Sequence, residues 1–101
     1  MDTTMDTFIK SLIFRKCQNV NVIDLDDEGV LYKENSNDEK LIVNTTVMAI
    51  WDLLDGKRTS FVIAQEIAAA CGVKCEAIEA DIYAQLAQFE KLQLIEQKRN
   101  Q

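Results

Sequence analysis

The stretch Val43-Asn44-Thr45-Thr46-Val47-Met48-Ala49-Ile50-Trp51-Asp52-Leu53-Leu54-Asp55-Gly56 joins a short apolar strand directly to a helix. Polar residues at positions 44–46 can cap this helix, because their side-chain oxygens accept hydrogen bonds from free N–H groups of the first turn. Glycine often ends a helix, because it tolerates the left-handed conformation, and Gly56 stands at that place. One helix face is apolar at helical spacing, through Val47, Ile50, Trp51 and Leu54. The stretch therefore predicts a strand that leads into an amphipathic helix buried on one side.

Short β-type runs precede this helix at residues 20–25, 30–32 and 41–43. Turn-forming residues at 27–29 and 35–38 separate them, which predicts an antiparallel meander. Helical periodicity returns at about 59–72 and about 75–91. The residues expected to face inward from these two helices are Ile63, Ile67, Ala70, Cys71, Ile78, Ile82, Leu86 and Phe89. The order predicts an α+β fold, in which a three-stranded antiparallel sheet is followed by three helices packed on one side of it.

The predicted domain organisation has one central unit between two short ends. Residues 20–96 form the domain, residues 1–19 an N-terminal arm, and residues 97–101 a polar tail. An apolar patch at 8–14 in the arm favours a helical turn or two, although a strand entering at Leu12 also fits its spacing.

Composition excludes several classes of function. Seventeen acidic residues outnumber eleven basic ones and give a net charge of −6, which disfavours binding to nucleic acid phosphates. No apolar run approaches the length of a membrane span, and the first residues are acidic where a secretory signal is basic. An odd number of cysteines, three, fits a reducing compartment, so a cytoplasmic location is expected.

The chain offers little for catalysis. It has no histidine, the commonest general base near neutral pH, and its three glycines are isolated, so no phosphate-binding loop exists. A metal site would lack ligands, and Cys71 is interpreted as a small core residue. Asp55 is expected to form hydrogen bonds locally at a helix end. We therefore expect neither an enzyme nor a cofactor.

Peptide binding suits a small sheet covered by helices. The unpaired backbone groups of an edge strand can accept another strand, and neighbouring side chains supply selectivity. Residues 40–43 form the natural edge, because they are short, apolar and last in the meander.

Several blocks of the sequence together resemble the PqqD-like family. Residues 43–56 resemble its L-N-x-T-A-x-x-I-W-x-L-x-D-G signature, and Gly29-Val30-Leu31-Tyr32 resembles its "G-v-L-y" strand. Ala80-Asp81-Ile82 with Leu86, and residues 92–95, resemble its last helix and its terminal segment. Gln93 replaces a common glycine, and Met48 a common small residue. The arginine-rich first strand and the Pro-Glu pair associated with pyrroloquinoline quinone biosynthesis are missing, so another peptide-modifying system is expected.

This resemblance implies a winged-helix-like RiPP recognition element. Such a module holds the leader segment of a ribosomally made precursor peptide for a separate enzyme, often a radical SAM enzyme or a cyclase. The leader would add as a strand antiparallel to the third strand and beside the third helix. The contacts implied for this chain, a free-standing adaptor, are Leu41, Ile42, Val43, Ala80, Tyr83, Ala84 and Ala87.

Other interpretations are a winged-helix nucleic-acid-binding regulator, which the acidic charge disfavours, and a structural subunit whose edge strand pairs with a second copy. The alanines at 80, 84 and 87 can equally pack against the other helices. A monomer and an edge-paired dimer both fit the sequence.

Overall fold

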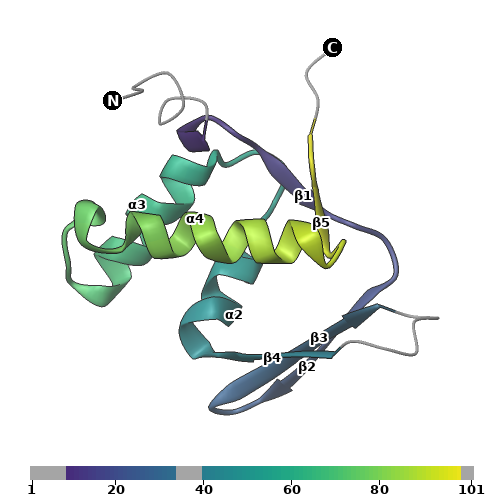
Figure 1. Ribbon diagram of the computed structural model, residues 1–101. Coiled ribbons are helices and arrows are strands. Elements are labelled where there is room, and N and C mark those ends of the chain that lie inside the picture. The colour runs from purple at the N-terminus through teal and green to yellow at the C-terminus, as the bar shows by residue number, and fades with distance from the viewer. Residues whose placement is uncertain (1–8, 34–39, 99–101) are drawn as a thin grey trace.

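The computed structural model describes residues 9–33 and 40–98, which form two antiparallel sheets and three helices (Figure 1). The predicted turn at 35–38 and the outermost residues of both chain ends lie outside these described ranges. A mixed α+β, winged-helix-like arrangement is confirmed.

The larger sheet has the strand order β2-β3-β4, with β2 at Val20–Leu25, β3 at Glu28–Lys33 and β4 at Lys40–Asn44. Both pairings are antiparallel, as the predicted meander requires. Because successive side chains of a strand point to opposite faces, the sheet has a buried face and an exposed face. Leu31 and Val43 lie on the buried face, whereas Ile23 and Ile42 lie on the exposed one.

The helices are α2 at Thr45–Asp52, α3 at Ser60–Cys71 and α4 at Cys75–Lys91. Asn44 caps α2, because its Oδ1 accepts a hydrogen bond from the N–H of Val47 at 2.9 Å. Thr59 caps α3 in the same way through Val62. Gly72 ends α3 with a φ of 71°, a left-handed conformation that glycine adopts readily.

A second, two-stranded sheet joins the two ends of the described chain. It pairs β1 at Phe14–Lys16 with β5 at Ile95–Gln97. Both interpretations of the apolar patch at 8–14 hold in part, because Ile9 and Lys10 are helical and the strand follows, beginning at Phe14 rather than Leu12. Figure 1 shows this small sheet beyond the end of α4, away from the sheet formed by β2, β3 and β4.

One hydrophobic core connects both sheets with all three helices. Phe14, Leu31, Trp51, Phe89 and Ile95 are among its buried members. Trp51 belongs to the core as expected, and its ring meets that of Phe89 edge to face, with centroids 5.6 Å apart.

The expectation that Cys71 is a core residue is wrong, because it is exposed at the last turn of α3. Ala70 beside it is exposed too. The buried face of α3 is formed further upstream, by Ile63, Ala64, Ile67 and Ala68. The last turn of the helix therefore extends beyond the core.

Candidate functional site

The strand β4 is an edge of the larger sheet. Within the described residues it pairs with β3 alone, so the backbone groups on its other side have no strand partner. The predicted edge position of residues 40–43 is therefore confirmed. Such an edge is a template for another strand.

The three predicted contact residues of β4 differ in exposure. Val43 is buried, Leu41 is half-buried, and the side chain of Ile42 is 66% exposed. This is the largest exposed fraction among the large apolar residues in the described part of the chain. The alternation follows from the pleat, which turns Leu41 and Val43 toward the core and Ile42 outward.

The position of β4 relative to α2 depends on a bare backbone at Gly29. Gly29 lies opposite Val43 in the β3–β4 register and is buried. A Cβ atom placed on Gly29 would overlap the Sδ atom of Met48, which reaches across from α2. Glycine therefore allows the methionine to lie directly on the strand, and the helix is held against the sheet beside its open edge.

The predicted contact residues of α4 lie next to the N-terminal segment. Tyr83 and Ala87 line a pocket together with Ile9, Leu12 and Phe14. Ala80 and Tyr83 line a neighbouring depression with Ile9 and Lys10, and Ala84 is exposed. Among the described residues that line these two hollows, none comes from β4, so neither hollow brings the two halves of the predicted site together.

The opposite flank of α4 carries half-buried side chains that are not among the predicted contact residues. Ile82, Leu86 and Phe89 are buried, and a helix advances about 100° per residue. Ile78, Gln85 and the C-cap residue Leu92 therefore lie on the other side of this buried stripe from Tyr83, and all three are half-buried. Figure 1 shows the N-terminal segment above α4 and the larger sheet below it. Helical spacing in the sequence identifies two flanks beside the buried stripe of α4. Only the position of the N-terminal segment in the structure shows which of the two it covers.

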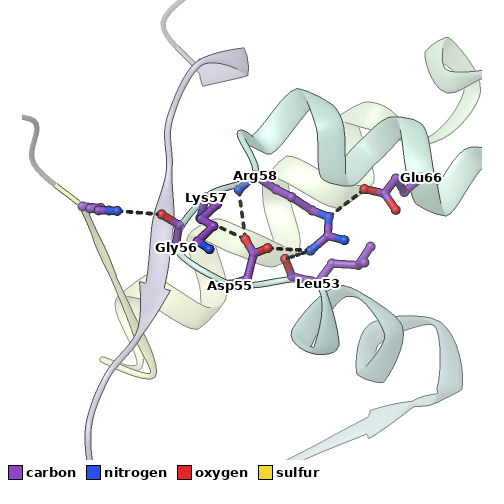
Figure 2. Close-up of polar contacts among 7 residues, drawn as sticks. Leu53, Asp55, Gly56, Lys57, Arg58 and Glu66 are labelled. Atoms are coloured by element: carbon purple, nitrogen blue, oxygen red, sulfur yellow. Dashed lines mark hydrogen bonds and ion pairs between the residues drawn. The ribbon is translucent and has the colours of Figure 1, made fainter.

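Asp55 fixes the loop between α2 and α3 (Figure 2). Its Oδ1 accepts hydrogen bonds from the backbone N–H groups of Lys57 and Arg58, each at 2.9 Å. Its Oδ2 accepts one from Arg58 Nη1 at 2.7 Å, while Arg58 Nε donates to Glu66 Oε2 on α3. The backbone hydrogen bonds hold the pKa of the Asp55 carboxyl below its usual value. The expected local hydrogen bonding of Asp55 is thus confirmed, but α2 already ends at Asp52, so the prediction that the helix ends at Gly56 is wrong.

Two of the cysteines, Cys17 and Cys75, have raised thiol pKa values. Burial, and after it the carboxylate of Glu79, raises the pKa of the Cys75 thiol, and burial also raises the pKa of Cys17. Nucleophilic cysteines have the opposite shift, because the thiolate is the reactive form. Within residues 9–33 and 40–98, no three His, Cys, Asp or Glu side chains are grouped to hold a metal ion. No helix in the described part of the chain is long and apolar enough to cross a membrane.

Comparison with known proteins gives three findings. The family model described as "Coenzyme PQQ synthesis protein D (PqqD)" matches residues 28–95. No curated protein matches the chain closely enough to count as a relative. Among solved structures, the chain is similar to "TbiB1 in Complex with the TbiA(beta) Leader Peptide", with 22% sequence identity and a TM-score of 0.71. This match covers 85% of the present chain and 99% of the other, and it shows a shared fold.

Proposed function

Since the chain belongs to the PqqD family, we propose that it is an adaptor that captures the leader segment of a ribosomally synthesised precursor peptide. The leader adds to the larger sheet as a strand antiparallel to β4 and is thereby presented to a separate modifying enzyme. The observation that carries the proposal is the open edge of β4, with Ile42 exposed and Leu41 half-buried. The TbiB1 structure, which shares this fold, holds a leader peptide.

Strand addition explains how a small domain without a deep pocket can bind a flexible peptide. Backbone hydrogen bonds supply affinity along an edge strand, and the side chains of alternate residues supply selectivity. The adaptor itself performs no chemistry in this proposal, and the modifying enzyme, such as a radical SAM enzyme or a cyclase, acts on the presented peptide. The raised pKa of Cys75 agrees with this division of roles.

Two flanks of α4 are candidates for the second wall of the binding groove. The sequence predicted Ala80, Tyr83, Ala84 and Ala87, two of which line the pocket beside the N-terminal segment. The flank of Ile78 and Gln85 is favoured because it lies on the other side of the buried stripe from Tyr83, which borders the N-terminal segment. Ala87→Arg and Gln88→Arg form a matched pair, because both residues are exposed neighbours on opposite flanks. If the flank of Ile78 and Gln85 forms the wall, Gln88→Arg weakens leader binding and Ala87→Arg does not; the reverse result favours the predicted residues.

Proline substitution tests strand addition on β4. Alternate N–H groups of an edge strand point outward, so either Leu41→Pro or Ile42→Pro removes a donor from the open side while the pairing with β3 survives. Both variants are made, and the one that keeps the wild-type circular dichroism spectrum is titrated with a fluorescent synthetic leader peptide that the wild type binds. We expect its affinity to fall at least about tenfold, a loss of ~1.4 kcal/mol.

Ile23→Pro is the matched control, because it places proline in β2, the other edge of the same sheet. This variant should bind the leader as the wild type does, provided that it stays folded. A folded β4 proline variant with unchanged affinity would contradict strand addition on this edge.

A further inference from the structure

The exposed face of the larger sheet carries an apolar row that ends at the open edge. Ile23, Val30 and Ile42 lie directly opposite one another across the three strands, on the face turned away from the core. Ile23 is 42% exposed, Val30 is half-buried and Ile42 is 66% exposed, so the residue at the open edge is the most exposed of the three. A strand added to β4 would extend this row by one residue, which would cover Ile42.

A cation stands next to this row on the same face. Lys40 lies two residues before Ile42 in β4 and opposite Tyr32 of β3. Its Nζ atom is 5.7 Å from the centroid of the Tyr32 ring. Within the described residues Lys40 makes no ion pair, since the salt bridges there involve Arg15 and Arg58. The Tyr32 ring leaves the charge of this ammonium group without an anionic partner among the described residues, so an added strand can supply one.

We propose that the outer face of this sheet selects the peptide, through an apolar residue opposite Ile42 and an acidic residue opposite Lys40. This inference rests on the proposed function, because it assumes strand addition to β4. Both existing pairings are antiparallel, and purely antiparallel sheets are favoured over mixed ones, so the added strand also runs antiparallel. The acidic residue then follows the apolar one by two positions toward the C-terminus of the peptide.

Selection from a displayed library of random peptides tests this inference on the full-length chain. The wild type should enrich peptides in which an aliphatic or aromatic residue precedes Asp or Glu by two positions. Lys40→Glu should enrich Lys or Arg at the acidic position instead. Lys74→Glu is the matched control, because it makes the same charge change in the turn before α4 and should keep the wild-type preference.

Affinities of one enriched peptide then separate the two recognition positions. We expect Ile42→Thr, which keeps the β-branched shape, to weaken binding about fivefold, as a lost cross-strand apolar pair would. Ile23→Thr makes the same change on the same face two strands away and should leave affinity unchanged. Lys40→Glu should also weaken binding about fivefold, with a smaller effect at high salt, and a peptide with Lys for the acidic residue should restore it.

The outcomes distinguish this inference from the proposed function. If enriched peptides lose affinity with the folded β4 proline variant but show no preference opposite Ile42 and Lys40, strand addition stands and selection by the outer face is wrong. An acidic residue that precedes the apolar one would also contradict the proposed antiparallel order. If the wild type enriches no peptide, or if its peptides bind the β4 proline variant equally well, both proposals fail.

Discussion

At the scale of single residues, Asp55 and Arg58 together stabilise the loop that connects α2 to α3. The Asp55 carboxylate accepts two backbone N–H groups and the Arg58 guanidinium, while Arg58 also reaches Glu66 on α3. Exposed ion pairs contribute little, so the backbone hydrogen bonds are the larger effect. The sequence indicated this local role, because an aspartate before glycine at a helix end commonly binds nearby backbone N–H groups.

Two substitutions at Asp55 separate these effects. Asp55→Ala removes every acceptor and should lower the Tm by a few degrees, whereas Asp55→Asn keeps Oδ1 and should lower it less. Thermal unfolding followed by circular dichroism measures both. Equal losses from Ala and Asn would show that the charge, not the backbone hydrogen bonds, stabilises the loop.

The same carboxyl predicts a pH dependence. Its pKa is lowered from the usual 3.8 in the folded chain, chiefly by the backbone hydrogen bonds from Arg58 and Lys57. The folded state therefore favours the ionised form, and this stabilisation is complete above the unfolded pKa and lost as pH falls through the folded one. The Tm difference between the wild type and Asp55→Asn should be constant near neutral pH and shrink below about pH 4. A difference that stays constant down to strongly acidic pH would contradict the assigned shift.

At the scale of elements, the β4–α2 junction could be predicted well and the environment of α4 could not. Asn44 caps α2 and Gly72 ends α3, because these effects depend on neighbours in the sequence. The buried stripe of Ile82, Leu86 and Phe89 also follows from helical spacing. One flank of α4 borders the N-terminal segment, which comes from the opposite end of the chain. Periodicity along α4 therefore could not decide whether Tyr83 and Ala87 contact that segment or a bound peptide.

Contact between Gly29 and Met48 predicts a coupled pair at this junction. Gly29→Ala introduces a methyl group that overlaps the Met48 thioether and should destabilise the chain by ~1–3 kcal/mol. Met48→Ala removes the obstacle, so the double variant should lose less stability than the two single losses combined. Urea unfolding of the four proteins measures this coupling. Additive losses would show that α2 does not depend on the bare backbone at Gly29.

At the scale of the whole molecule, the two ends of the described chain complete one core. Phe14 on β1 and Ile95 on β5 are buried with residues of the larger sheet and of all three helices. The sequence predicted an arm at 1–19 with an apolar patch at 8–14, but not its strand partner, because a three-residue strand has too little pattern to identify a partner so distant along the chain. The domain bounds of 20–96 remain a prediction, and Phe14 shows that the preceding segment contributes to the core.

Truncating Phe14 tests how strongly this segment stabilises the domain. Phe14→Ala should cost ~3 kcal/mol or more in the free energy of unfolding, as for other buried aromatic residues. Phe61→Ala is the matched control, because that ring is only half-buried and should cost less. Equal and small losses in urea unfolding would show that β1 is an appendage rather than part of the core.

Amide hydrogen exchange with and without a bound peptide tests strand addition on β4 most directly. The measurement uses the ¹⁵N-labelled chain and a leader peptide, and reads each backbone N–H of β4 at Lys40–Asn44. Strand addition predicts that alternate amides of β4, exposed to solvent at the open edge, become protected when the peptide binds, while those of the other edge strand, β2, stay unchanged. A saturating peptide that leaves the β4 amides unprotected, and instead protects residues around Ile9, Leu12 and Tyr83, would contradict the account.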